Sequence, residues 1–210
     1  MSRGWFITLE GPEGSGKTTA ARHLAEWLRG RGVVTVLTQE PGGTPLGEEV
    51  RRIVLHMRGM SDDLDPRADA LLYAAGRAQH VARVIRPALE RGEWVVCARF
   101  LDSSLAYQGA GYGNDPDEMR RLQDFATGGL RPDLTILLDV PVEVGLERTR
   151  RRKEWNRFED TAGAAFFDRV RAAYLRMAAE DPERFRIVDG AGSVDASDEA
   201  IRDLVERELL

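Results

Sequence analysis

The sequence contains very little cysteine and very little lysine. Cys97 is the single cysteine among 210 residues, so no disulfide can form within the chain. We therefore expect a reducing compartment, in which a lone cysteine is usually a small buried apolar residue. Of the 30 lysines plus arginines, Lys17 and Lys153 are the two lysines, which leaves 28 arginines. A lysine in this chain therefore stands out from the residue that normally supplies its positive charge.

The chain also lacks a long apolar run and an excess of positive charge. No apolar stretch approaches the roughly 20 residues that a membrane helix needs, and no apolar signal region precedes the first expected strand. We therefore expect a cytoplasmic protein with no membrane contact. The net charge of −5 argues against a partner that is a nucleic-acid polymer, since such binders need a basic face. At 42% apolar and 31% charged residues, the composition predicts a single globular domain over residues 1–210.

One stretch near the N-terminus has the pattern of a phosphate-binding loop, or P-loop. Residues 11–18, GPEGSGKT, match G-x-x-x-x-G-K-[ST] at every fixed position, between a β-rich run (5–9) and a helical pattern (19–29). Glycines let consecutive N–H groups turn inward around phosphate oxygens at a helix N-terminus. Lys17 would reach the β- and γ-phosphates, and the Thr18 hydroxyl would ligate Mg²⁺. The predicted nucleotide-binding residues are Gly11, Pro12, Glu13, Gly14, Ser15, Gly16, Lys17, Thr18 and Thr19.

The rest of the pattern predicts an α/β fold. Buried β-rich runs recur at 33–37, 94–97, 134–138 and 185–188, with helical patterns between them. Five strands that alternate with helices predict a three-layer fold, a five-stranded parallel sheet covered by helices on both faces. The longest helical pattern covers 67–90, and Pro87 should kink its end. Other helices are expected at 46–57, 117–126, 142–152, 166–179 and 198–209.

Several polar segments follow the carboxyl ends of the expected strands. Glu40 opens the breaker-rich segment EPGGT, residues 99–109 follow the third strand, and Asp139 ends the fourth. Ligands bind beyond this edge in parallel sheets, so we expect these loops to meet the P-loop there. Arg99 could hold a phosphate through two hydrogen bonds or form an ordinary surface salt bridge.

Two further groups allow a structural and a functional interpretation. Tyr73 and Arg77 lie four residues apart on one helix face, as core residues or as a stacking aromatic with an arginine that reads a base. Residues 148–157 carry six cations and one acidic residue. They form either a solvated helix end or a lid that closes over transferring phosphates.

Five stretches together resemble the bacterial type of thymidylate kinase, a P-loop kinase family that phosphorylates dTMP to dTDP with ATP. The likeness runs in the same order over nearly the whole chain, and EPGGT and AYQG are its most specific pieces. The stretches are LEGPEG (9–14), EPGGT (40–44), YAAGR (73–77), SSLAYQG (103–109) and RPDLT (131–135).

This resemblance implies a role for most of the residues named above. Glu13 would face the sugar hydroxyl or phosphate of the acceptor, and Arg99 would hold the acceptor phosphate and the transferred group. Tyr73 would stack on the base, and Arg77 would reach the carbonyl edge of thymine. The other expected substrate contacts are Glu40, Pro41, Ser103, Ser104, Tyr107 and Gln108.

The resemblance also implies where the catalytic arginines lie. This subtype has no basic residue between the P-loop glycines, in agreement with Pro12, Glu13 and Ser15, and its arginines come from a lid at about residues 148–160. Arg152 matches the family position best and Arg150 next, so the expected catalytic set is Lys17, Arg99, Arg150 and Arg152. A homodimer is expected by resemblance, with ATP as phosphate donor and Mg²⁺ as metal.

Two positions depart from the family, and two other functions compete with this one. Ala98 stands where the family usually has aspartate, which puts the outer-shell hold on Mg²⁺ in doubt, and Asn156 replaces a lid aspartate. One alternative is a kinase for another nucleoside monophosphate or a nucleoside. The other is a nucleotide switch, because residues 160–163 read D-T-A-G. That stretch follows a charged run rather than a strand, and the chain has no N-K-x-D pattern to read guanine.

Overall fold

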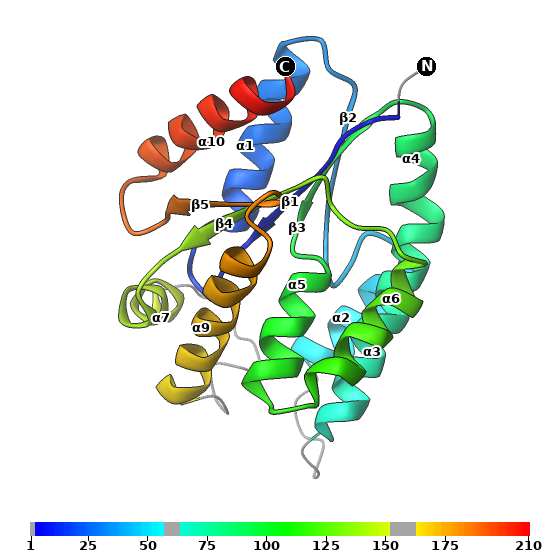
Figure 1. Ribbon diagram of the computed structural model, residues 1–210, viewed down its shortest axis with the longest axis vertical. Helices are drawn as coiled ribbons and strands as arrows, with labels where there is room; N and C mark the ends of the chain where they lie inside the picture. Colours follow the sequence, from blue (N-terminus) through cyan, green and yellow to red (C-terminus); the bar gives the residue numbers. More distant parts are fainter. Residues whose placement is uncertain (1–2, 57–63, 152–162) are drawn as a thin grey trace.

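The five expected strands form one parallel sheet with the P-loop strand at its centre. The computed structural model describes residues 3–56, 64–151 and 163–210 (Figure 1). Within these ranges the strand order is β2-β3-β1-β4-β5, which confirms the predicted sheet. All five residues of β1 are buried, because helices cover both of its faces. The strands are β1 (Phe6–Glu10), β2 (Thr35–Gln39), β3 (Trp94–Ala98), β4 (Leu134–Asp139) and β5 (Phe185–Asp189).

Alternate residues of each strand face two different layers of helices. Ile7 and Leu9 pack toward α1 (Lys17–Gly30) and α10 (Val194–Leu209), which lie side by side in Figure 1. Phe6 packs on the other face against α4 (Arg86–Glu90). Further helices are α2 (Pro45–His56), α3 (Pro66–His80), α5 (Leu101–Ser104), α6 (Pro116–Thr127), α7 (Val142–Arg150) and α9 (Ala164–Glu180). No helix in the described ranges is both long enough and apolar enough to cross a membrane.

The segment after β3 differs from the sequence interpretation. Residues 99–109 are expected to be a loop, but residues 101–111 form α5 and the π-helical segment η2 (Leu105–Gly111). Eight of the nine residues 101–109 are buried, so this helix has no solvent-facing side. A helix buried all round lacks the amphipathic period by which sequence patterns reveal helices, and its serines and glycines resemble those of a loop.

The long helical pattern at 67–90 is confirmed as helical but is not uniform. It consists of α3, the π-helical segment η1 (Val81–Ile85) and α4, so the change begins several residues before Pro87. The Arg86 N–H bonds to the Val81 carbonyl, five residues back, which widens the turn. Proline has no N–H to donate, and a widened turn is a common way to accommodate it within a helix.

Candidate active site

The P-loop leaves the central strand and closes tightly on α7. Gly11, Gly14 and Gly16 have φ values of 147°, 73° and 88°, which favour glycine. A Cβ atom on Gly14 would lie 2.2 Å from the carbonyl oxygen of Gly145 in α7. The N–H groups of Gly14, Gly16 and Thr18 have no acceptor within the described residues, as a loop built to receive an anion requires.

Lys17 and Thr18 begin α1 at this loop. Lys17 is buried, and its Nζ donates to the Pro12 carbonyl at 2.9 Å and to Ser15 Oγ at 3.3 Å. Thr18 is exposed beside it. No group of three or more His, Cys, Asp or Glu in the described part of the chain could hold a metal ion. An exposed Thr18 hydroxyl next to a phosphate-binding loop nevertheless fits Mg²⁺ that is held mainly by nucleotide oxygens and water.

Arg99 lies opposite the P-loop in a strained conformation. It follows β3 directly with a φ of 68°, which side chains other than glycine rarely adopt. Its guanidinium contacts the Glu13 carboxylate, donates to the Tyr107 hydroxyl and to Ser103 Oγ at 3.3 Å each, and lies 4.8 Å from the centroid of the Tyr107 ring. The Tyr107 hydroxyl also donates to Glu13 at 3.1 Å. The structure thus brings four predicted site residues into one cluster.

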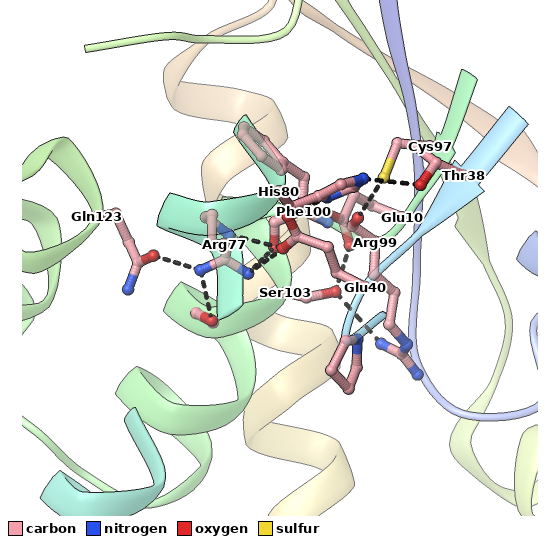
Figure 2. Close-up of polar contacts among 12 residues, drawn as sticks. Glu10, Thr38, Glu40, Arg77, His80, Cys97, Arg99, Phe100, Ser103 and Gln123 are labelled. Carbon is pink, nitrogen blue, oxygen red and sulfur yellow. Dashed lines mark hydrogen bonds and ion pairs between the residues drawn. The ribbon is translucent and has the colours of Figure 1, made fainter. Parts of the chain in front are cut away.

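Arg77 is the centre of a second, more deeply buried cluster (Figure 2). Its side chain is 1% exposed, and Nε donates to Glu40 Oε2 at 2.8 Å. Nη2 pairs with the same carboxylate and donates to the Phe100 carbonyl at 3.0 Å, while Nη1 donates to Ser104 Oγ at 3.0 Å and to the Gln123 side-chain oxygen. Every N–H of the guanidinium therefore has an acceptor.

Sequence reasoning missed two members of the Arg77 cluster. Gln123 approaches from α6, and His80 Nδ1 lies 2.9 Å from the other oxygen of Glu40. His80 Nε2 contacts Thr38 Oγ1 at 2.7 Å, so the chain of contacts reaches β2. His80 lies three residues beyond Arg77 on α3, and this spacing was the one available signal. Nothing local in the sequence pointed to Gln123.

The other predicted base and sugar residues lie along the same helices. Tyr73 is half-buried on α3, four residues before Arg77. Gln108 is buried, and its Nε2 donates to Asp69 Oδ2 at 3.1 Å. The Pro41 carbonyl accepts from Arg51 Nη1 at 3.0 Å, which ties the EPGGT segment to α2.

The arginine-rich segment divides into anchored and exposed members. Arg148 donates to the carbonyls of Gly190 at 2.6 Å and Ala191 at 2.8 Å, so it fastens α7 to the turn before α10. Arg151 pairs with Glu147, whereas Arg150 is exposed and has no partner within the described ranges. Arg152, the rest of the expected lid to residue 160, Asn156 and residues 160–162 of D-T-A-G lie outside the described residues.

Glu10 is a buried carboxylate that the sequence analysis did not single out. It ends β1, directly before the P-loop, and accepts from the Phe100 N–H at 2.7 Å and from Ser103 Oγ at 2.6 Å. Burial, together with the charge of Asp102, raises the pKa of Glu10 to about 7. An acidic residue at the end of an otherwise apolar strand was the signal that could have found it.

Asp102 and Asp139 lie near the same edge of the sheet and are the candidates to take the place of the aspartate that Ala98 lacks. The carboxylate of each is already bonded to an arginine. Asp102 accepts two hydrogen bonds from Arg184, at 2.7 and 3.0 Å. Asp139 accepts two from Arg171, at 2.7 and 2.8 Å. Each carboxylate is therefore held by an arginine as a structural ion pair.

The fold is a parallel sheet with a P-loop after its central strand, β1. An arginine, Arg99, faces that loop from the end of the neighbouring strand, β3. This combination defines a P-loop kinase. The chain belongs to the thymidylate kinase family, since the family model described as "Thymidylate kinase" matches residues 9–201.

Individual thymidylate kinases match this chain over nearly its full length. The chain is 51% identical to a thymidylate kinase of Pseudomonas syringae pv. tomato, over 99% of this chain and 97% of that protein. It is 55% identical to one from Leifsonia xyli subsp. xyli, over 91% and 90%. The crystal structure of thymidylate kinase from Ehrlichia chaffeensis superposes with a TM-score of 0.76 at 33% identity, covering 96% of this chain and 99% of that one.

Proposed function

We propose that this chain transfers the γ-phosphoryl group of ATP to the phosphate of dTMP, giving dTDP and ADP. Family membership supports the reaction. The observation that carries the proposal within the structure is the contact between Arg99 and Glu13, because it places a phosphate-binding guanidinium against the loop that binds ATP. Phosphoryl transfer depends mainly on positioning and on stabilisation of charge, which this arrangement can supply.

ATP would bind along the P-loop, residues 11–19. Lys17 is held close to the loop and can turn its ammonium from the Pro12 carbonyl to the β- and γ-phosphates. Mg²⁺, when bound, neutralises charge on these phosphates, and Thr18 is the residue we assign to it. The open N–H groups at Gly14 and Gly16 would take phosphate oxygens.

dTMP would lie between the two arginine clusters. Arg99 would turn from Glu13 to the acceptor phosphate, while Tyr73 stacks on the base. Arg77 would share one N–H with a thymine carbonyl, beside the Ser104, Tyr107 and Gln108 contacts, and Glu40 would keep its guanidinium in place. A guanidinium donates only, so it favours a carbonyl edge over the amino group of cytosine.

The remaining proposals concern the lid and the whole chain. Arg150, at the end of α7, and Arg152 would supply positive charge to the transferring group, within one kinase domain of residues 1–210. We also propose a cytoplasmic homodimer. Leu46 on α2, Leu71 on α3 and Phe125 on α6 are 47%, 58% and 88% exposed, and α3 adjoins both α2 and α6. A neighbouring set of exposed apolar residues fits the core of an interface.

A coupled assay of ATP consumption tests the function against its alternatives. The acceptor panel is dTMP, dUMP, dCMP, thymidine and no acceptor, each with Mg²⁺. We expect turnover with dTMP to exceed that with dCMP and thymidine, and little turnover without an acceptor. Preference for thymidine would indicate a nucleoside kinase, and preference for dCMP another monophosphate kinase. Slow hydrolysis that no acceptor accelerates would indicate a nucleotide switch.

A further inference from the structure

Behind Arg99, three oxygen atoms from three different elements form a closed triangle (Figure 2 draws its Glu10 and Ser103 members). Glu10 Oε2, at the end of β1, lies 2.6 Å from Ser103 Oγ and 2.9 Å from the Tyr174 hydroxyl of α9. The Ser103 and Tyr174 hydroxyls are themselves 2.9 Å apart. Glu10 and Tyr174 have no exposed surface, and Ser103 is 8% exposed, so water does not replace any of these contacts readily.

The number of protons decides which form of Glu10 this triangle fits. An ionised Glu10 leaves two hydroxyl protons for three oxygen–oxygen contacts, so one pair of oxygens would face each other without a hydrogen. A proton on Glu10 supplies the third, and each contact then becomes a hydrogen bond. Glu10 Oε1 accepts from the Phe100 N–H in either state. The geometry therefore fits the protonated carboxyl, in agreement with a pKa of Glu10 raised by burial to about 7.

The charged and titratable groups around Glu10 act in opposite directions. Asp102 on α5 favours the protonated form, and Arg99 favours the ionised form. Charge on Glu10 in turn raises the pKa of the Cys97 thiol on β3 and of the Tyr174 hydroxyl, both of which are raised mainly by burial. Arg99 is already shared with Glu13 of the P-loop. A phosphate dianion at Arg99 would add negative charge and occupy the same guanidinium, so it would make an ionised Glu10 less favourable.

We propose that Glu10 takes up one proton from solvent when the phosphate of dTMP binds at Arg99. Glu10 is then a positioning residue whose protonation is linked to occupancy of the acceptor site. In the protonated form it completes the triangle and holds the turn after β3 without opposing the incoming phosphate. This inference rests on the proposed binding of dTMP at Arg99.

Calorimetric titration with dTMP in buffers of different ionisation enthalpy measures the proton uptake directly. At pH 8 a phosphomonoester, with its second pKa of about 6, is already dianionic and takes up no proton itself. We expect uptake approaching one proton per bound dTMP at pH 8. At pH 6 Glu10 already carries its proton and about half of the free dTMP is a monoanion, so binding of the dianion should release about half a proton, in the wild type and in Glu10→Gln alike. The Glu10→Gln variant should bind dTMP without uptake at pH 8. Wild-type binding without uptake, or equal uptake in the variant, would overturn the inference and leave the proposed function standing.

A second variant keeps the inference testable if Glu10→Gln does not fold. Asp102→Asn removes the neighbouring negative charge, so uptake should begin at lower pH than in the wild type. Asp139→Asn is the matched control, because it also loses a carboxylate held by an arginine but has no contact with Glu10. An uptake profile that Asp102→Asn leaves unchanged would contradict the inference. Failure of the wild type to bind dTMP at all would overturn both the inference and the proposed function.

Discussion

Lys17 and Arg77 are both buried cations in the proposed nucleotide-binding sites, but their side chains have different kinds of partner. Lys17 bonds to a carbonyl and a hydroxyl of its own loop, neither of which carries charge. Arg77 is paired with a carboxylate that is itself 5% exposed. Removing each should therefore have a different consequence for the free energy of unfolding.

For Lys17→Ala we expect turnover to fall by roughly 10²–10³-fold, the range seen when one charge-stabilising donor is lost. The melting temperature without ligand should fall less than in Arg77→Ala, because the hydrogen bonds of Lys17 to Pro12 and Ser15 are bonds to uncharged groups. A coupled kinase assay and a thermal scan of the same preparation measure both quantities. Near-normal turnover would contradict the assignment of the P-loop.

For Arg77→Ala we expect the protein to lose about 3–5 kcal/mol of stability, because Glu40 would remain buried without its cation. Arg77→Lys keeps the charge but cannot reach all the acceptors, so it should lose less stability while discriminating less between dTMP and dCMP. Urea unfolding of both variants, with steady-state kinetics for the two nucleotides, tests this. Equal stability of Arg77→Ala and wild type would show that the pair contributes little to the fold.

Among the elements, α7 is the one whose arginines have the most divided roles. Arg148 is fixed to the turn before α10, Arg151 pairs with Glu147, and Arg150 is exposed at the end of the helix. Arg150 and Arg151 therefore form a matched pair of neighbouring arginines for mutation.

Arg150→Ala should lower kcat more than it raises the KM for dTMP, by about 10³-fold or more if the residue acts as an arginine finger does. Arg151→Ala should change kcat by less than about twofold, since an exposed helical ion pair contributes little. Steady-state kinetics of the two variants decide between the alternatives. Small and equal effects would favour the interpretation of this segment as a solvated helix end.

The end of β3 supports a prediction about the metal. Ala98 is 3% exposed and packs with Ile7 and Leu9 on the α1 side of the sheet. An aspartate there could accept hydrogen bonds from water bound to Mg²⁺. Ala98→Asp should lower the half-saturating Mg²⁺ concentration by roughly tenfold, and the isosteric Ala98→Asn should do less. A Mg²⁺ titration of turnover measures this, and an unchanged midpoint in both variants would show that other groups hold the metal.

At the scale of elements, the sequence predicted most of what can be found from local patterns. The strands and most helices lie where the spacing of apolar residues predicts them, and the P-loop lies where its motif predicts it. Tyr73 and Arg77 share one helix, as their spacing predicts. The helix at 101–111 was not predicted, because a helix buried on every side has no amphipathic pattern. The sequence also did not predict the roles of Glu10, Gln123 and His80, because their partners come from tertiary contacts and not from a local pattern.

The arrangement of the whole molecule puts the proposed dimer face on α3 and α6, the helices that carry Arg77 and Gln123 of the proposed base site, together with α2. Phe125→Glu should therefore convert the dimer to a monomer, because a charge would be buried at the centre of the interface. Ile187→Glu is the control, since Ile187 is 55% exposed on β5, at the opposite edge of the sheet from β2. Sedimentation equilibrium of both variants tests this. Dissociation by Ile187→Glu and not by Phe125→Glu would place the interface elsewhere.

The contact between Gly14 and Gly145 restricts which substitutions this chain can accept in evolution. A methyl group at residue 14 would meet the backbone of residue 145, and one at residue 145 would lie 2.3 Å from the Glu13 carbonyl oxygen. A second substitution cannot remove backbone atoms. A side chain at either glycine would therefore clash with backbone, and no later substitution could relieve the clash. Variation that the surrounding helix and loop tolerate must accumulate around these two positions, which are fixed together.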